Sequence, residues 1–139
     1  MRDPNCIFCK IAARDVPASV VYEDDSILAL LDVAPLADAH VLVIPREHYA
    51  QLTDMPAGAC AALAAALPRL GRAVLAVSGA EGFNLLQNNG RAAGQAVDHV
   101  HFHLIPRATG DGLGYRWNAG AYPEGRAETL ATAYRDALA

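Results

Sequence analysis

Three histidines in alternate positions are the feature of this chain best suited to chemistry. They are His99, His101 and His103, in the segment HVHFHLIP at residues 99–106. In an extended strand, alternate side chains share one face, so the imidazoles would form a row spaced about 6.5 Å apart while the intervening apolar residues enter the core. Such a row can bind a metal, hold a phosphate, or aim one neutral ring at a phosphorus atom.

Glycines and side-chain amides lie just upstream of this row. Gly94 and Gln95 shortly precede it, and the segment Asn-Asn-Gly occupies residues 88–90. A glycine turn with amides beside imidazoles supplies the donors that an oxyanion or phosphate site needs. The alternative is a half-buried strand whose outer face happens to carry histidine, and these neighbours weigh against it.

The cysteines suggest a second site. Cys6 and Cys9 form a C-x-x-C pair, which a short helix over residues 6–13 would place on one face. The pair alone fits metal ligation, redox chemistry or two buried thiols, although no thioredoxin-like strand and helix surround it. Cys60 lies in an alanine-rich run and is expected to be a small buried hydrophobe. The odd number of cysteines argues against a disulfide framework.

The histidines and cysteines must be positioned by helices and strands, and the sequence predicts strand pairs followed by helices. Strands are expected over residues 20–22, 27–31, 40–44, 83–87 and 100–106, and helices over 6–13, 57–77 and 124–138. Pro68 predicts a kink in the long helix or its division into two short ones. With no repeating strand-helix-strand series, the pattern predicts an α+β fold with a mostly antiparallel sheet, in a single domain spanning residues 1–139.

Composition narrows the possible partners. The chain has 139 residues, of which 53% are hydrophobic and 19% charged, so it is too apolar to be disordered. Its net charge of −4 argues against stable binding of nucleic acid. The longest apolar run, residues 59–67, is short of the roughly 20 residues of a membrane span, and the N-terminus resembles no secretory signal. We therefore expect a cytoplasmic protein with no membrane or nucleic-acid partner.

The histidine row and its surroundings resemble the histidine triad (HIT) superfamily. The segment GQAVDHVHFHLIP at residues 94–106 matches the family's signature of three alternating histidines. Further matches, in order and spacing, are Cys6 to Cys9, Tyr22 to Asp25, Leu31 and Asp32, His40 to Pro45, His48, and Gly82 to Asn88. The resemblance covers about residues 5–107 and leaves 108–139 as a C-terminal tail. It implies a five-stranded sheet with a short N-terminal helix and one long kinked helix, dimerising into a continuous sheet.

The same resemblance implies a nucleotidyl hydrolase or transferase. His101 would attack the α-phosphorus of a purine nucleotide, and water would release the nucleotide from the covalent nucleotidyl-His101. The leaving group would be an amine, as in a phosphoramidate, or the second phosphate chain of a dinucleoside polyphosphate. His103 would share or donate a proton, and His40 would complete a chain with His99. The remaining alternative is a nucleotide-binding interaction module with weak activity.

Substrate-binding residues are also implied by the resemblance. Asp32 would bind the ribose hydroxyls, whereas Asn88, Gln95 and His103 would contact the phosphate or the leaving group. An apolar slot for the base would be formed in part by Ile7, Phe8, Leu31 and Val33. Many members carry Ser or Thr where Ala96 stands. The missing hydroxyl is worth about 1–2 kcal/mol of transition-state stabilisation if the reaction uses it.

A zinc site is a further implication. Cys6 and Cys9 with His48 and His99 would form a tetrahedral Cys2His2 set, which resembles that of a subset of bacterial members. Zinc bound there would be structural, would anchor the N-terminal helix against the histidine strand, and would remove His99 from proton transfer. In the tail, Tyr115 and Trp117 are expected to pack on the surface or at a homodimer interface, or to cover the nucleotide.

Overall fold

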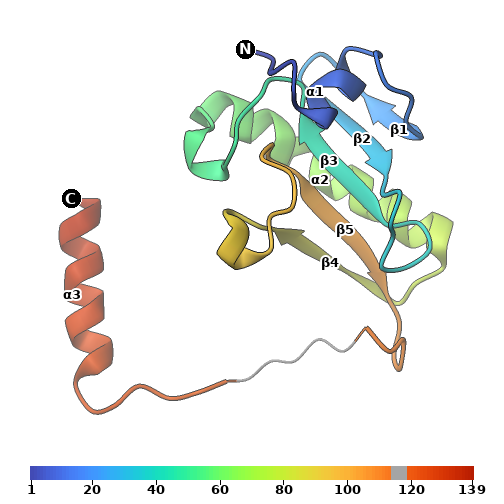
Figure 1. The fold of residues 1–139 in the computed structure, drawn as a ribbon. Coiled ribbons are helices and arrows are strands. Elements are labelled where there is room, and N and C mark those ends of the chain that lie inside the picture. The colour runs from blue at the N-terminus through green and yellow to red at the C-terminus, as the bar shows by residue number, and fades with distance from the viewer. Residues whose placement is uncertain (114–118) are drawn as a thin grey trace.

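The structure, a computed structural model, describes residues 1–113 and 119–139, which include a five-stranded sheet (Figure 1). The strands are β1 (Val20–Glu23), β2 (Ile27–Leu31), β3 (Val41–Pro45), β4 (Gly82–Gln87) and β5 (Phe102–Arg107). The helices are α1 (Ile7–Ala12), α2 (Ala57–Ser78) and α3 (Arg126–Leu138), with 3-10 turns at Leu52–Asp54 and Arg91–Ala93. The strand order is β1-β2-β3-β5-β4 and every neighbouring pair is antiparallel, which confirms the predicted α+β fold.

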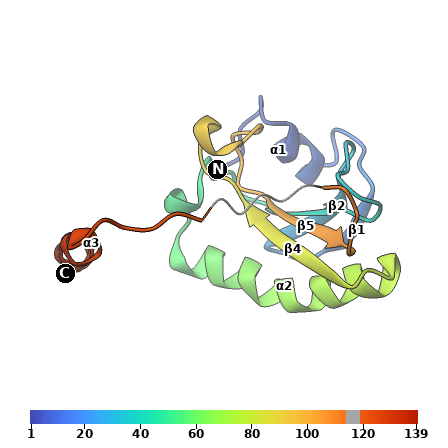
Figure 2. The ribbon, with the colours of Figure 1, turned by 90° about the horizontal axis from the view of Figure 1, so that it is seen from below.

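A helix covers each face of this sheet. Figure 2 shows α2 along one face and the shorter α1 on the other. In β2, Ile27 and Ala29 pack in the cluster that contains the α2 side chains, whereas Leu28 and Leu30 pack in the cluster that contains those of α1. Burial on both faces explains why β2 and β3 are continuous apolar runs, although antiparallel strands often alternate.

The hairpin between β1 and β2 is closed by Asp24. Its carboxylate Oδ1 accepts the backbone N–H groups of Ser26 at 2.8 Å and Ile27 at 2.9 Å. These bonds satisfy backbone donors in the tight turn and explain why an acidic stretch separates the two apolar strands. The hairpin predicted from the sequence is confirmed.

The helix α2 is continuous, so the expected alternative of two short helices is wrong. Pro68 lies inside it and removes the hydrogen bond to the carbonyl of Ala64. Both residues are exposed, so water can satisfy that carbonyl and the helix continues. It ends at Gly79, whose φ of 68° is the left-handed conformation that glycine adopts without strain.

By length and composition alone, α2 could also cross a membrane. Its Leu63, Leu70 and Val74 are buried in the core that it forms with the sheet. Arg69 and Arg72 lie on its exposed side. These contacts hold one side of the helix against the sheet, although only 22% of its apolar stretch is buried.

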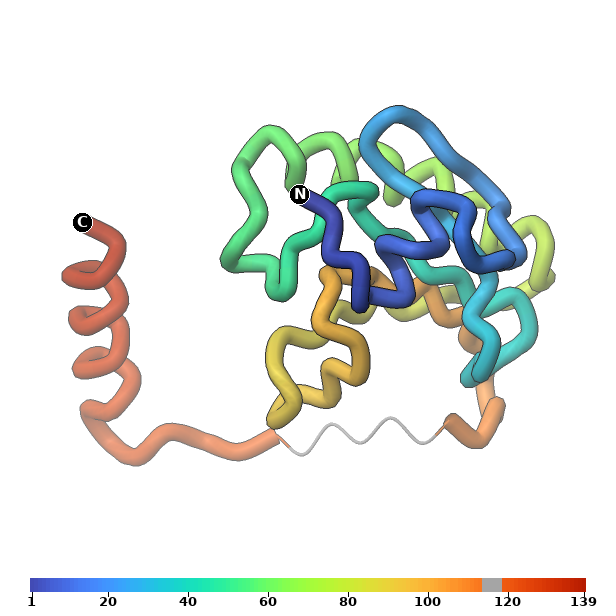
Figure 3. Tube along the Cα trace, turned by 45° about the horizontal axis from the view of Figure 1, so that its top comes forward, coloured from blue at the N-terminus to red at the C-terminus, as the bar shows by residue number. Residues whose placement is uncertain are grey.

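The strand β5 begins at Phe102, two residues later than the sequence analysis expected. His99, Val100 and His101 therefore precede the ladder. Beyond β5 the chain leads to α3, which stands apart from the sheet in Figures 1 and 3. The aromatic residues Tyr115 and Trp117, to which the sequence analysis gave a role, lie outside the described residues.

Candidate functional site

The histidine row lies on the sheet face that carries α1. The sequence analysis expected the apolar residues of this segment to enter the core, and Val100 and Leu104 are indeed fully buried. The histidine face itself is covered, with His99 at 0% exposure and His101 at 6%. Phe8 of α1 supplies part of this cover, since its ring lies edge-on to both imidazoles with centroids 5.7 and 5.2 Å away.

The ring of His101 is held in one tautomer by its own backbone neighbour. Its Nδ1–H donates to the carbonyl oxygen of His99 at 2.7 Å. A neutral imidazole has one proton, so Nε2 of His101 keeps a free lone pair. No partner for that Nε2 is found among the described residues. The ring is therefore arranged as a nucleophile.

The ring of His103 is held in the opposite tautomer by a chain of two hydrogen bonds. The backbone N–H of Leu36 donates to Nδ1 of His40 at 3.1 Å, so a neutral His40 carries its proton on Nε2. That Nε2–H donates to Nδ1 of His103 at 2.9 Å. The proton of His103 consequently lies on Nε2, where it can be donated to a ligand.

Burial keeps the imidazole rings of His40 and His103 neutral. Burial, together with nearby His101 and His40, lowers the pKa of His103 from 6.5 to about 4. Burial also lowers the pKa of His40, which the carboxylate of Asp32 partly opposes from 3.6 Å. With its ring centroid 5.0 Å from that of His101, His103 thus presents a donor beside a lone pair. That pairing suits attack at phosphorus with stabilisation of the phosphate oxygens.

The partner of His40 corrects one expectation. The sequence analysis placed His40 in a chain with His99, but the structure pairs it with His103. His99 instead turns its Nδ1 toward the cysteines of α1. The physical reason is register, because β3 lies beside β5 with Leu42 opposite His103, which brings the start of β3 to that part of the row.

A second correction concerns Gln95, expected to contact the substrate. Its side chain is buried and its amide is fully used by the backbone: Oε1 accepts from Gly90 N–H at 2.7 Å, and Nε2 donates to Ala50 at 2.7 Å and Val97 at 3.0 Å. The bond to Ala50 ties the loop before the histidines to the segment after β3, and the other two brace the loop itself. Gln95 therefore shapes the loop and has no free group to offer a phosphate.

Asn88 and Asp32 are available to a ligand. Asn88 is half-buried and directly follows Gln87, which pairs with Phe102, so it lies level with His101. Its side-chain nitrogen is 3.6 Å from the point where a Cβ on Gly94 would stand. Asp32 is half-buried at the end of β2, and its Oδ1 accepts the N–H of Ala34 at 2.9 Å.

The four residues expected to line the base slot differ in their surroundings. Phe8 is buried against the histidines, so it backs the site and does not face an open slot. Ile7 and Leu31 are about two-fifths exposed, at 41% and 39%, and Val33 is 96% exposed. These three remain accessible to an apolar ligand.

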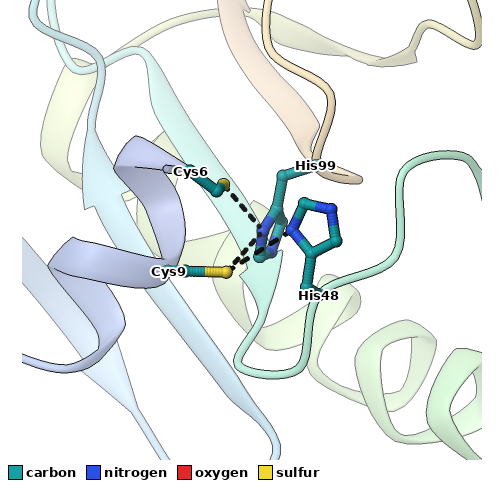
Figure 4. Close-up of side chains that lie close together, drawn as sticks. All are labelled: Cys6, Cys9, His48 and His99. Carbon is teal, nitrogen blue, oxygen red and sulfur yellow. Dashed lines mark hydrogen bonds between the residues drawn. The ribbon is translucent and has the colours of Figure 1, made fainter. Parts of the chain in front are cut away.

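The predicted Cys2His2 set comes together in space (Figure 4). Its four ligand atoms, from Cys6, Cys9, His48 and His99, all lie within 4.8 Å of one another. Cys6 Sγ is 3.4 Å from Nδ1 of His99, and Cys9 Sγ is 3.4 Å from Nδ1 of His48 and 3.6 Å from Nδ1 of His99. A tetrahedral zinc ion with ordinary bond lengths separates sulfur and nitrogen ligands by about 3.5 Å, so the set fits such an ion.

The surroundings of this set also suit a cation. The Nε2–H of His99 donates to the carbonyl of Pro45 at 2.8 Å, which leaves Nδ1 unprotonated for a metal. The backbone N–H of Asp3 points at Cys9 Sγ from 3.3 Å. Burial raises the pKa of the Cys9 thiol and neighbouring Cys6 adds to the rise, which a bound divalent ion would reverse.

A second trio, Asp32, His40 and His103, has ligand atoms equally close together. Here the tautomer argues against a metal. Because Leu36 N–H donates to Nδ1 of His40, the proton of that ring lies on Nε2, the atom that would have to bind the ion. This trio is therefore a hydrogen-bonded chain, unlike the set around His99.

Sequence reasoning missed the backbone groups that set these tautomers: the N–H of Leu36 and the carbonyls of Pro45 and His99. Every residue has such groups, so the side-chain pattern gives no signal for them. Two sequence features could have indicated these backbone partners: the position of Leu36 in the loop before His40, and the end of a strand at Pro45.

The chain belongs to the HIT family, because the HIT domain model matches residues 13–110. It is 44% identical over 114 residues to an adenosine 5'-monophosphoramidase of Schizosaccharomyces pombe, covering 81% of this chain and 83% of that protein. A crystal structure of a HIT family member from Bacillus subtilis superposes with a TM-score of 0.92 at 36% identity, over 97% and 98% of the two chains. A zinc-bound histidine triad protein from Mycobacterium smegmatis has a TM-score of 0.75 at 39% identity, again over 97% and 98%.

Proposed function

We propose that this chain is a nucleotidyl hydrolase that cleaves its substrate at the α-phosphorus, with His101 as nucleophile. The observation that carries the proposal is the pair of opposite tautomers, a lone pair on Nε2 of His101 beside an N–H on Nε2 of His103. One ring can attack while the other donates to a phosphate oxygen. A binding module without activity would not require this pairing.

The reaction proceeds in two displacements at phosphorus. Nε2 of His101 forms a bond to the α-phosphorus, the bond to the leaving amine breaks, and the amine takes a proton from solvent. The nucleotidylated ring is cationic, and the carbonyl of His99 stabilises it by accepting Nδ1–H. Water then attacks the same phosphorus, gives its proton to solvent, and the electron pair of the broken bond returns to Nε2 of His101.

The substrate proposed is a purine nucleoside phosphoramidate. The name of the Schizosaccharomyces pombe relative, an adenosine 5'-monophosphoramidase, supports both the base and the amine leaving group. Asp32 would bind the ribose and Asn88 the phosphate, with the base on the apolar surface of Ile7, Leu31 and Val33. A base recognised by apolar contact is read weakly at its edges, so purines are preferred by area and stacking.

We further propose that Cys6, Cys9, His48 and His99 hold a structural zinc ion. The donor set fits tetrahedral zinc, and the zinc-bound Mycobacterium smegmatis protein supports the choice of metal. When bound, zinc would keep both thiols ionised and join α1 to the histidine segment. The free thiols and the thiolate ligands suit a reducing compartment, which is consistent with the proposed cytoplasmic location. We also propose that two copies of the chain associate as a homodimer through the edge strand β4.

Replacement of the nucleophile tests the proposal. His101→Ala should lower turnover of an adenosine phosphoramidate by at least about 10³-fold while nucleotide binding persists. Mass spectrometry of the wild-type protein quenched during turnover should show a nucleotidyl adduct on the peptide containing His101. Side-by-side rates on a diadenosine polyphosphate identify the preferred leaving group. Retained turnover in His101→Ala, or an adduct on another residue, would contradict the assignment.

A further inference from the structure

We infer that His99 is a positioning residue, through which the Cys2His2 set aligns the nucleophile His101. This inference rests on the proposed function of His101. It gives the metal site a catalytic consequence beyond stabilising the fold. The element that links the two sites is one backbone carbonyl, that of His99.

The sheet does not hold this carbonyl. The ladder begins at Phe102, which is paired with Gln87 of β4 and Val43 of β3. His99 and His101 precede that first pair, and the bond from Nδ1 of His101 to the His99 carbonyl joins two residues outside the ladder. The position of the acceptor must therefore be set by other contacts.

Those contacts come from the last residue of β3 and the segment that follows it, residues 45–50. The carbonyl of Pro45 accepts Nε2–H of His99 at 2.8 Å, and that of Tyr49 accepts the backbone N–H of Val100 at 2.8 Å. His48, in the same segment, lies against Cys9 and edge-on to the His99 ring. Side-chain and backbone contacts thus replace the sheet at this point.

The fully buried ring of His99 is anchored at both nitrogens. Nε2 is bound to the Pro45 carbonyl, whereas Nδ1 faces Cys6 and Cys9. Figure 4 shows this ring between α1 and the loop that carries His48. An ion in the set would fix the second nitrogen, and with it the side chain and the carbonyl of the same residue.

The helix α1 adds a second route to the nucleophile. Its two thiols flank Phe8, whose ring packs on both His99 and His101. A metal that anchors Cys6 and Cys9 therefore also fixes the wall beside His101. Without the ion, only weak hydrogen bonds between thiols and imidazoles would hold the set, so α1 and the His99 ring would both be held less firmly. Displacements of about 1 Å near reacting atoms cost about 100-fold in rate.

His48 is the ligand best suited to a test, because it is half-buried and belongs to neither α1 nor the histidine row. His48→Gln should lose the metal, His48→Cys should keep it as a Cys3His site, and Cys60→Ser is the matched control outside the set. Each purified protein is assayed for bound zinc, for kcat and KM with an adenosine phosphoramidate, and by ¹⁵N–¹H NMR for the Nδ1–H of His101.

We expect His48→Gln to lose zinc, to lose the His101 Nδ1–H signal, and to fall about 10- to 100-fold in kcat with a much smaller change in KM. His48→Cys should restore all three readouts, and Cys60→Ser should match the wild type. If His48→Gln does not fold, reversible removal of zinc from the wild-type protein by a chelator gives the same comparison. A folded, zinc-free protein with unchanged kcat and NMR signal would overturn the inference.

The two proposals can fail separately. If zinc-loaded wild-type protein forms no adduct at His101, the proposed function fails, whatever the effect of the metal on structure. If the adduct forms equally fast with and without zinc, the function stands and the positioning role of His99 is excluded. A lower melting temperature alone, with kcat unchanged, would also exclude it, because that result describes a purely structural metal.

Discussion

At the scale of single residues, the partner of one ring nitrogen decides what each histidine of this site can do. His99 donates from Nε2 to the Pro45 carbonyl, which leaves Nδ1 free for a metal. His101 donates from Nδ1 to a carbonyl, which leaves Nε2 free for phosphorus. His40 accepts a backbone N–H and becomes a donor at Nε2. Backbone groups thus give identical side chains the free ring nitrogens that the proposed roles of ligand, nucleophile and donor require.

The hydrogen-bonded imidazoles of His40 and His103 predict that the stability of the protein depends on pH. Burial lowers the pKa of both rings, that of His103 from 6.5 to about 4, despite the opposing charge of Asp32. Between those two pH values the unfolded chain binds protons that the native protein does not. The contribution of these two rings to the free energy of unfolding should therefore be fully present above pH 6.5 and should be lost as the pH falls toward 4.

Urea denaturation across that pH range measures the effect, with His103→Asn as the comparison. This variant lacks one of the two rings, so its stability should decrease less steeply below pH 6.5 than that of the wild type. Protonation of the Cys2His2 set in acid is common to both proteins and cancels in the difference. Equal slopes for the two proteins would show that His103 keeps an ordinary pKa.

The sequence revealed the residues of the site but not all of their partners. Alternation alone predicted that His99, His101 and His103 share a face, because strand geometry fixes side-chain direction. The role of Gln95 could not be obtained in this way. Its bonds to Gly90 and Val97 are local, but its bond to the carbonyl of Ala50 joins residues 45 positions apart in the sequence, and only the fold brings these two together.

At the scale of elements, α2 makes a prediction about Pro68. This proline lies in the interior of a continuous helix, is exposed, and leaves the carbonyl of Ala64 without its helical partner. Pro68→Ala should therefore stabilise the protein by about 2 kcal/mol, after allowing for the greater freedom of the unfolded chain. Thermal unfolding checks the gain, and unchanged zinc content and kcat would show that Pro68 has no part in the site. Destabilisation by Pro68→Ala would contradict this account of the helix.

Most helix and strand boundaries could be predicted from the residue types of turns and caps, and the exceptions have identifiable physical causes. The acidic turn at Asp24 and the glycine at the end of α2 were readable, because turn and cap conformations restrict residue type. The start of β5 was placed too early, since alternation continues from His99 although pairing begins only at Phe102. Before that residue, the contacts of the His99 ring with Pro45, Cys6 and Cys9 replace the pairing that a strand would supply.

At the scale of the whole molecule, the two edges of the sheet differ in a way that concerns the proposed homodimer. The edge strand β1 has four residues, an irregular register between Val20 and Tyr22, and a charged end at Glu23. The other edge, β4, has six residues without charge and exposes Phe83 and Leu85. Long, uncharged, apolar edges invite pairing with another strand, whereas irregular and charged ones resist it.

The C-terminal helix α3 also supports the proposed homodimer. The helix α3 carries Leu130, Tyr134 and Leu138 along one side, and the last two are 68% and 83% exposed. A helix of 13 residues is marginally stable in water without a surface to cover it. A second copy of the chain would offer such a surface, so the edge strand β4 and the helix α3 both support the proposed homodimer.

A charge placed on β4 tests the proposed dimer through that edge. Leu85→Lys should raise the dissociation constant of the homodimer at least about tenfold, because the ammonium would be buried where two copies of β4 meet. The matched control is Val21→Lys on β1, a residue of similar exposure at 52% against 48% for Leu85. Sedimentation velocity over a range of concentrations gives both constants. Equal weakening by the two substitutions would exclude a β4-specific interface, and a wild type that is monomeric throughout would exclude the dimer itself.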